Sequence, residues 1–151
     1  MKTTNAVHSS VAQRLESAGQ RYTSGRRVLI EALAAAGKPV SLPELLALVP
    51  GTPQSSAYRN LAVLSESGAV QRLPSTDEFG RFELAEALTG HHHHHLQCTA
   101  CGMVTDIELS ATVEGVLRDT EASLAKQTGF AVNSHLVSFE GLCKACAQRS
   151  R

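Results

Sequence analysis

Four cysteines are the residues whose types and spacing point most directly to chemistry. They form two Cys-x-x-Cys pairs, Cys98 with Cys101 and Cys143 with Cys146. Each pair can turn two soft thiolates toward one ion, and four thiolates in a tetrahedral arrangement are typical of a structural zinc site. Because such a site has no open coordination position, the spacing predicts zinc that stabilises the fold and performs no reaction. Two redox-active dithiols or unrelated thiols are the alternatives.

A run of five histidines, His91–His95, directly precedes the first cysteine pair. Side chains alternate between the two faces of an extended strand, so His92 and His94 share one face, and His93 and His95 share the other. One strand could therefore supply two imidazoles to each of two metal sites. A solvated polar tract and an expression tag are the alternatives; the tag is disfavoured because the run is internal and leads into Leu-Gln-Cys without a linker.

Each pair of imidazoles needs further ligands, because two ligands alone hold a first-row metal ion weakly. Glu83 can join His93 and His95, and since it stands before a predicted hinge, a metal ion there would fix one domain against the other. On the other face of the strand, His92 and His94 can be joined by Glu114 of the predicted helix and by His135 of the last predicted strand. The candidate ligands of this second metal site are His92, His94, Glu114 and His135. A core histidine without a ligand role is the alternative for His135.

Length and composition limit the class of protein. The chain has 151 residues, enough for one ordinary domain or two small ones, and 42% hydrophobic with 19% charged residues excludes a wholly disordered chain. No apolar run approaches the roughly 18 residues that cross a bilayer, and the N-terminus lacks the apolar stretch of a secretory signal. We therefore expect a cytoplasmic protein without a membrane partner, where a reducing environment favours metal over disulfides.

The formal net charge is zero, but the charges are distributed unevenly along the chain. Residues 1–82 carry nine Lys and Arg against six acidic residues, whereas residues 83–151 carry five against eight. A basic front half can meet phosphates, and an acidic, His-rich back half can attract cations. Chance is the alternative explanation for an imbalance of this size.

Helical periodicity and capping residues predict short helices in the first half of the chain, followed by a β-hairpin. The helices run from Val7 to Ala18, from a cap at Thr23 or Ser24 to Ala36, from the Ser41–Glu44 capping box through Val49, and from Thr52, with Pro53 in the first helical position, to Gly68. The strands are Val70–Leu73 and Arg81–Leu84, around a turn-rich loop at 74–80. This order predicts a winged-helix domain over residues 1–84.

The composition changes after Thr89-Gly90, which places a hinge at residues 85–90. Residues 91–151 are predicted to form a small α/β domain. Its expected strands are His92–Cys98, Met103–Leu109 and Phe130–Phe139, and its helix is Thr112–Thr128. The fold class is therefore α+β, with a winged helix followed by a small metal-binding domain.

Four segments resemble the ferric uptake regulator superfamily of metal-responsive repressors, and the resemblance covers nearly the whole chain. They are Arg21–Ile30 in the second helix, Ser55–Leu61 with its Tyr-Arg pair, His92–Gly102, and Gly141–Cys146. The resemblance implies a winged-helix DNA-binding domain joined to a dimerisation domain with structural zinc. It also implies a homodimeric repressor of metal-uptake or homeostasis genes that binds an inverted-repeat operator in double-stranded DNA.

The resemblance also implies roles for individual residues. It assigns structural zinc to Cys98, Cys101, Cys143 and Cys146, a hinge sensor site to Glu83, His93 and His95, and an accessory site to His92, His94, His135 and a helix carboxylate. Glu114 is the first choice for that carboxylate, with Glu121 and Glu108 as competitors. The expected DNA contacts are Ser55, Ser56, Tyr58 and Arg59, with Arg72 or Arg81 of the wing beside the backbone. Bracing of the helix is the alternative role for Tyr58 and Arg59.

The identity of the sensed metal stays open at this stage. Imidazole-rich sites with one carboxylate favour Zn²⁺, but the same ligand types accept Fe²⁺, Ni²⁺ and Mn²⁺, and bound iron could sense peroxide. The chain departs from iron-type relatives at Pro39, where a His ligand is usual, and from zinc-type relatives at Gln71 and Ala85, where Asp and Cys are usual. A zinc hydrolase and a zinc-storage protein are alternatives from other classes, although no His-Glu-x-x-His pattern occurs and storage leaves the winged helix unused.

Overall fold

Capping residues set the helix boundaries in the first half of the chain. The Thr23 side chain accepts a hydrogen bond from the backbone N–H of Arg26, and Gly37 ends the helix with a φ of 60°, a conformation that favours glycine. Ser41 and Glu44 form the complete capping box that the sequence predicted. The following helix begins at Gln54 and not at Thr52, because Pro53 adopts an extended conformation and serves as the cap residue.

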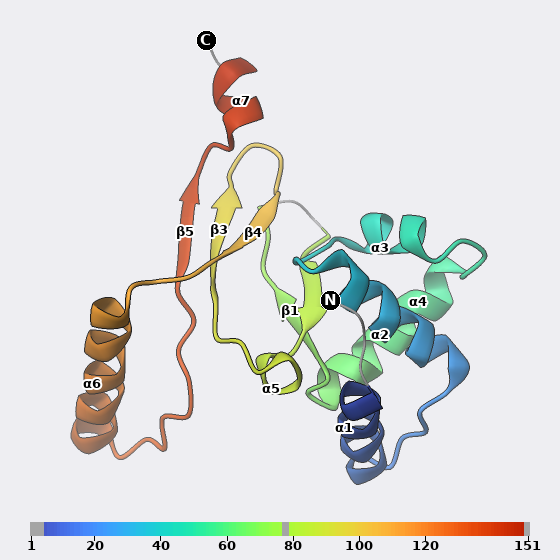
Figure 1. Ribbon diagram of the computed structural model, residues 1–151, viewed down its shortest axis with the longest axis horizontal. Helices are drawn as coiled ribbons and strands as arrows, with labels where there is room; N and C mark the ends of the chain where they lie inside the picture. Colours follow the sequence, from blue (N-terminus) through green and yellow to red (C-terminus); the bar gives the residue numbers. More distant parts are fainter. Residues whose placement is uncertain (1–4, 77–78, 150–151) are drawn as a thin grey trace.

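The computed structural model describes residues 5–76 and 79–149 (Figure 1). The first part contains α1 (Asn5–Ser17), α2 (Ser24–Ala36), α3 (Leu42–Leu48), α4 (Gln54–Glu66), β1 (Val70–Leu73) and β2 (Arg81–Leu84). The second contains β3 (His94–Cys98), β4 (Val104–Ile107), α6 (Ala111–Thr128), β5 (Ser138–Gly141) and α7 (Lys144–Arg149). The predicted loop at 74–80 includes residues 77 and 78, which lie outside the described residues.

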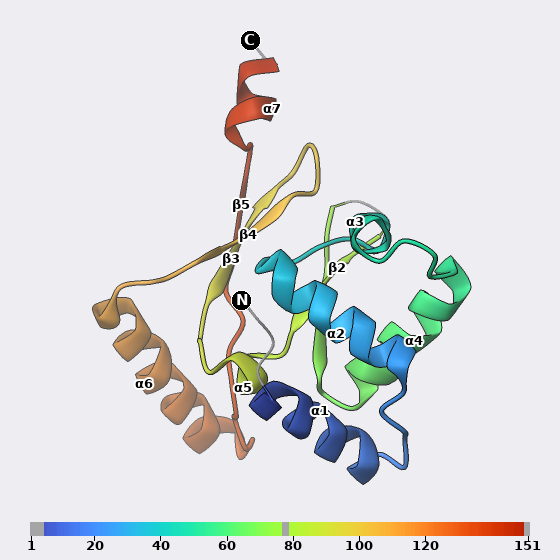
Figure 2. The same ribbon diagram turned by 45° about the vertical axis from the view of Figure 1, so that its right-hand side comes forward.

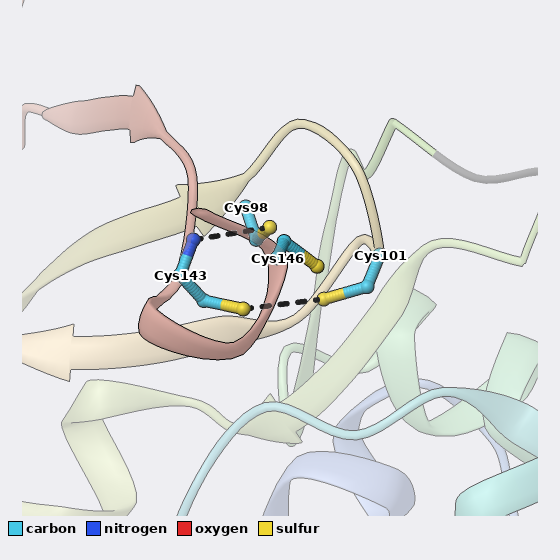
Figure 3. Close-up of side chains that lie close together, drawn as sticks. All are labelled: Cys98, Cys101, Cys143 and Cys146. Carbon is cyan, nitrogen blue, oxygen red and sulfur yellow. Dashed lines mark hydrogen bonds between the residues drawn. The ribbon is translucent and has the colours of Figure 1, made fainter. Parts of the chain in front are cut away.

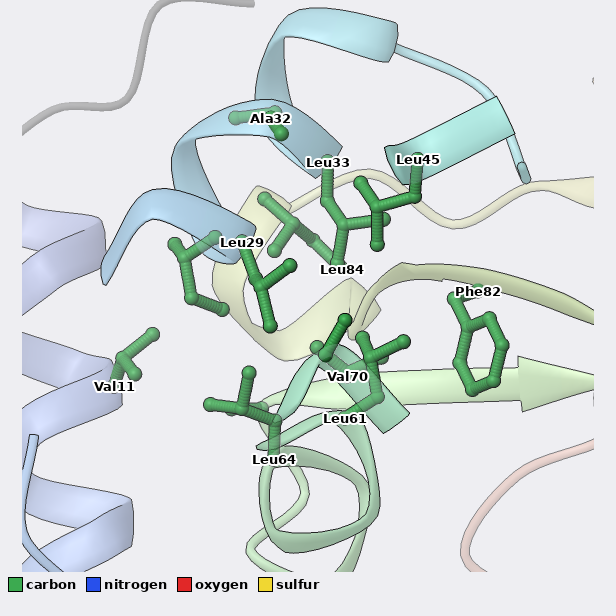
Figure 4. Close-up of a cluster of buried hydrophobic side chains, with 14 of the residues drawn as sticks. Val11, Leu29, Ala32, Leu33, Leu45, Leu61, Leu64, Val70, Phe82 and Leu84 are labelled. Atoms are coloured by element: carbon green, nitrogen blue, oxygen red, sulfur yellow. The ribbon is translucent and has the colours of Figure 1, made fainter. Parts of the chain in front are cut away.

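The hydrophobic core lies where α1, α2 and α4 pack on the β1–β2 hairpin (Figure 4). Leu29 and Leu61 are fully buried in it, and each lies on the apolar face of its helix. The hairpin is antiparallel, with Val70 opposite Leu84, so both of these residues point into the same core. The arrangement is that of a winged helix, as the sequence predicted, and it holds the N-terminal end of α4 at the surface.

The connection between the two parts is more ordered than a plain hinge. Residues 86–89 form a single helical turn, α5 (Glu86–Thr89), which Gly90 ends with a φ of 70°. The sequence predicted no helix in this segment, because four residues are too few to show a periodic pattern. Helix α5 contacts α1, so the connector is attached to the first part of the chain (Figure 2).

The second part is a three-stranded sheet in the order β4-β3-β5. β3 pairs with β4 antiparallel and with β5 parallel, which makes it the central strand. The expected strand over 130–139 is wrong in its extent: β5 covers only Ser138–Gly141, and the preceding residues 130–137 follow an irregular path beside α6. The turn of helix α7 after the sheet was not expected either.

Helix α6 lies on the side of the sheet away from α1–α4 and contains no buried residue (Figure 1). The sequence predicted an apolar side for this helix, and its residues Val113, Val116 and Leu124 are 44%, 61% and 46% exposed. An amphipathic helix is stabilised by covering such a stripe, so α6 lacks a covering surface within the described residues of one chain. No helix among these described residues is long and apolar enough to cross a membrane.

Candidate metal centres

The four cysteine side chains converge at one end of the sheet (Figure 3). Cys98 ends β3 and Cys101 lies in the turn that leads to β4, whereas Cys143 lies between β5 and α7 and Cys146 lies in α7. All four sulfur atoms lie within 4.8 Å of one another, and none forms a disulfide. The Sγ atoms of Cys101 and Cys143 are 3.9 Å apart. One ion can therefore contact all four sulfurs, as a structural zinc ion does.

The pKa values of the thiols differ strongly within this cluster. The backbone N–H of Cys143 donates to Sγ of Cys98 at 3.3 Å, and such donors lower the pKa of Cys98 to about 6. The backbone N–H of Met103 acts to lower the pKa of Cys101, but the neighbouring thiols outweigh it and raise that pKa to about 11. One thiolate forms readily and a second is opposed by the first charge, so a cation is needed to hold four thiolates together. The cluster fits Zn²⁺.

A second cluster lies between the two parts of the chain. It combines Glu83, from the end of β2, with His93, His95 and Asp106 from the sheet, and the ligand atoms lie within 4.8 Å of one another. The Nε2 atoms of His93 and His95 donate to the two oxygens of Glu83 at 3.1 and 3.0 Å. We call these four residues the hinge cluster. They join the wing hairpin to β3 and β4.

Burial and charge shape the hinge cluster. Glu83 and His95 are buried, and a cavity of about 170 Å³, bordered by the end of α2 and by Lys38 just after it, opens onto the cluster. Burial acts to lower the pKa of His93, but its hydrogen bond with Glu83 and the charges of Glu83 and Asp106 raise that pKa above its usual value. Burial raises the pKa of Asp106, and the charge of Glu83 adds to this shift. Two imidazoles and two carboxylates facing one point form a donor set that divalent first-row metals accept.

Asp106 is the member of this cluster that the sequence analysis missed. The sequence could have indicated this residue, because antiparallel pairing around the Cys98–Gly102 turn places Asp106 directly opposite His95. Its carboxylate is 3.8 Å from Nε2 of His93 and 3.9 Å from Nε2 of His95. Fixing the register of the hairpin would have placed Asp106 on the face of the sheet that His93 and His95 share.

The third cluster lies on the opposite face of β3. His92, His94, Glu114 and His135 bring their ligand atoms within 4.8 Å of one another, and we call them the accessory cluster. His94 is 1% exposed, and its Nε2 donates to Glu114 at 2.7 Å, the bond that contributes most to lowering the pKa of that carboxyl. The other Glu114 oxygen lies 3.6 Å from His92 and 3.7 Å from His135.

Outer carboxylates orient two imidazoles of the accessory cluster. Nδ1 of His92 donates to Glu86 and Nδ1 of His135 donates to Glu121, each at 2.9 Å. Carboxylates only accept, so these contacts place the protons of the neutral rings on Nδ1. The two Nε2 lone pairs then face each other at 3.1 Å, an arrangement that a shared cation or proton stabilises. The site fits a metal ion.

The three candidate carboxylates of the accessory site have different positions. Glu114 lies in the cluster, whereas Glu121 contacts the outer nitrogen of His135 and Glu108 is exposed on the chain after β4. These positions favour Glu114 as the ligand. Glu121 instead orients the imidazole of His135, a role that the sequence alone did not indicate.

The expected DNA-contacting residues lie at the start of α4. Ser55, Tyr58 and Arg59 line a shallow groove, bordered by Leu42 of α3, and Tyr58 is 56% exposed. Ser56 is half-buried on the same helical turn. Nε of Arg59 donates to the carbonyl of Ser55 at 3.3 Å, so this side chain also braces its own helix.

The two wing arginines differ in exposure. Arg81 is 5% exposed and donates to the carbonyl of Gly80, so its proposed place beside a DNA backbone is wrong. It lies on β2, whose residues are all buried because the strand pairs with β1 and packs against α2. Arg72 is exposed, and its guanidinium lies 5.9 Å from the ring centre of Phe82. Arg72 is therefore the wing arginine that can reach a phosphate.

The chain is similar in sequence and in fold to several known proteins. The sequence profile of the ferric uptake regulator family matches residues 17–140. The chain is 33% identical over 92 residues to the ferric uptake regulation protein of Bacillus subtilis, covering 61% of this chain and 58% of that protein. It is 30% identical over 139 residues to the peroxide-responsive repressor PerR of Staphylococcus saprophyticus, covering 89% and 88%. The fold superimposes on the Helicobacter pylori ferric uptake regulator Fur with a TM-score of 0.75 at 21% identity, over 97% and 95% of the two chains.

Replacing Cys146 with Ser is expected to abolish the zinc that resists mild chelation and to unfold the second part of the chain. Structural zinc contributes about 10–16 kcal/mol in small zinc-dependent folds, and few apolar side chains are buried around this sheet. Elemental analysis and circular dichroism measure both effects. Glu83→Gln is the control and should keep the tightly held zinc. A Cys146→Ser protein that retains zinc at the wild-type ratio would contradict the assignment.

The hinge cluster should bind metal more weakly as the pH falls. The pKa of His93 is raised, so the ring holds a proton at pH values where a free imidazole has lost it, and a metal ion must displace that proton. The affinity should fall by about tenfold per pH unit below this pKa. Imidazole NMR of the chelated protein should give a midpoint for His93 above 6.5, and Glu83→Gln should lower it. An unchanged midpoint in that variant would show that Glu83 is not the cause.

Proposed function

This chain belongs to the ferric uptake regulator family, whose members are metal-dependent transcriptional regulators and not enzymes, and we propose that it is a zinc-responsive repressor of metal-uptake or homeostasis genes. The observation that carries the proposal is the hinge cluster. Glu83 belongs to the wing hairpin, whereas His95 and Asp106 belong to the sheet of the second part and His93 directly precedes β3. A ligand set divided in this way makes the relative position of the two parts depend on metal.

The residues of the hinge cluster explain how metal would act as a switch. Without a cation, the carboxylates of Glu83 and Asp106 repel each other, and the imidazoles of His93 and His95 donate hydrogen bonds to Glu83. A divalent cation supplies the two positive charges that this donor set lacks. Glu83 then stays close to β3, and the β1–β2 hairpin is held in one orientation relative to the sheet. The helix α4 packs on β1, so its orientation follows.

Regulators of this family bind operator DNA as dimers. We propose that α6 and β5 form the dimer interface, because Val116, Phe130 and Phe139 are exposed apolar side chains on this side of the molecule. A dimer built on this face is two-fold symmetric, and its two α4 helices would meet an inverted-repeat operator in double-stranded DNA.

Helix α4 is the proposed reading element. Ser55, Ser56 and Tyr58 are the proposed contacts to bases or phosphates, Arg59 the proposed phosphate contact, and Arg72 the wing contact. Exposure at the start of a helix, beside a shallow groove, suits insertion into the major groove. Arg59 can leave the Ser55 carbonyl for a phosphate, because that carbonyl is exposed and can bind water instead.

The ligand types support zinc as the sensed ion. The accessory cluster offers three imidazoles and one carboxylate, a borderline donor set of four that suits tetrahedral Zn²⁺. A specific observation favours the second candidate: two of the four hinge ligands are carboxylates, which also suit Fe²⁺, Mn²⁺ and Ni²⁺. An iron-, manganese- or nickel-responsive regulator, or one that senses peroxide through iron, is the alternative.

Restoring metals one at a time tests the proposed function. Protein chelated until only the zinc of the cysteine cluster remains should bind the promoter region of its own gene weakly. Zn²⁺ should restore binding at lower free concentration than Fe²⁺, Mn²⁺ or Ni²⁺, as measured by fluorescence anisotropy under anaerobic conditions. Restoration by another ion at lower concentration would replace zinc with that ion. DNA binding that ignores every divalent metal would contradict a metal-dependent regulator.

Replacing Arg59 with Ala should weaken specific DNA binding by about tenfold or more and reduce its salt dependence, because a phosphate contact is lost. The matched control is Arg118→Ala, which removes an exposed arginine from α6. Anisotropy titrations at several salt concentrations measure both. Metal affinity should be unchanged in both variants. Equal DNA affinity of the Arg59→Ala and Arg118→Ala proteins would assign Arg59 to bracing α4.

A further inference from the structure

One carboxylate contacts neighbouring residues that belong to different metal clusters. Glu86 lies in α5, and its Oε2 accepts a hydrogen bond from Nδ1 of His92 at 2.9 Å. Its other oxygen, Oε1, accepts from the backbone N–H of His93 at 3.2 Å. The imidazole of His92 belongs to the accessory cluster, and that of His93 belongs to the hinge cluster. Glu86 therefore joins the two sites through a single side chain.

The geometry places Glu86 outside the ligand sets of both clusters. It contacts His92 at Nδ1, whereas Nε2 of His92 faces the accessory cluster. It lies 3.9 Å from Nδ1 of His93, whereas Nε2 of His93 contacts Glu83 in the hinge cluster. On both rings the carboxylate is at the edge away from the shared ligand atoms. Glu86 thus orients His92 and fixes the backbone of His93.

The charge of Glu86 suits this role. Two donors, Nδ1–H of His92 and the backbone N–H of His93, face its two oxygens, an arrangement that suits an ionised carboxylate. An ionised carboxylate on Nδ1–H strengthens the Nε2 lone pair of the same ring as a ligand. The negative charge of Glu86 also strengthens the hydrogen bond that it accepts from the backbone N–H of His93.

We propose that Glu86 is a positioning residue that couples the accessory cluster to the hinge cluster. When Nε2 of His92 binds an ion, the ring and Glu86 are fixed in the orientation described above. The second oxygen of Glu86 then holds the backbone from which the His93 imidazole extends, so less freedom is lost when the hinge cluster binds its own ion. The effect is reciprocal, because coupling free energy is shared by both sites. The proposal rests on the proposed function only in requiring that both clusters bind metal.

Glu121 provides the matched comparison. It accepts from Nδ1 of His135 at 2.9 Å, as Glu86 does from His92, but the structure gives it no contact with a hinge residue among those described. Both Glu86→Gln and Glu121→Gln should weaken the accessory cluster. Only Glu86→Gln should remove the coupling. In that variant the amide NH₂ can donate to Nδ1 of His92 and move the ring proton to Nε2.

A double-mutant cycle with Zn²⁺ as the only added ion tests the coupling. Full-length dimer with its cysteine zinc retained is titrated against a competing chelator, while long-range imidazole NMR follows His94 and His95 as separate reporters. Emptying the accessory cluster by His135→Ala should lower the hinge affinity about 5- to 20-fold, within the usual range of coupling between sites. In the Glu86→Gln background the same change should be less than about twofold, and in the Glu121→Gln background it should persist.

Each other outcome overturns the proposal. Equal losses in the wild-type and Glu86→Gln backgrounds would place the coupling elsewhere, and no loss in the wild type would show that the sites are independent. Hinge binding that is far weaker in the Glu86→Gln, His135→Ala protein than in the His135→Ala protein would show that Glu86 acts on the hinge cluster directly, without the accessory cluster. A His92 ring still protonated on Nδ1 in Glu86→Gln would remove the orienting role. These measurements contain no DNA, so a failure of metal-dependent DNA binding counts against the proposed function alone.

Discussion

The alternation of side chains along β3 is the constraint on which the metal chemistry depends. The strand is central in its sheet, paired with β4 on one edge and β5 on the other, so its backbone cannot rotate to present its histidines differently. Its pleat sends His94 toward α6 and His95 toward the wing hairpin. The expected strand over 92–98 begins only at His94, and His92 and His93, which directly precede it, join the same two clusters. A shift of one residue in register would exchange the two sets and separate every imidazole from its carboxylate.

The two parts of the chain are stabilised in different ways. The first part has a conventional apolar core built from α1, α2, α4 and the hairpin. In the second part, the buried hydrophobic residues among those described are Cys98, Val104 and Cys146. So small a core cannot offset the entropy of ordering the sheet and α6. The second part must therefore depend on its cysteine cluster and on a covering surface for α6.

This division has a consequence for regulation. The first part has its own apolar core, whereas the order of the second part is expected to depend on its cysteine cluster and on a surface that covers α6. The connector between them holds Glu86 in a short helix that contacts α1, next to residues of both histidine clusters. The proposed metal sites of the second part therefore lie next to the connector that joins it to the first part.

Local sequence determined the winged-helix order, the capping box at Ser41, the convergence of paired cysteines and the division of the histidines between two faces. Each of these follows from spacing within one element or from two strong ligand pairs, which need no knowledge of distant packing. Only the tertiary structure decided that Asp106 joins the hinge cluster, that Arg81 is buried, and that β5 is short. These features depend on strand register and on which surface each element packs against, and both are set by contacts between segments far apart in the chain.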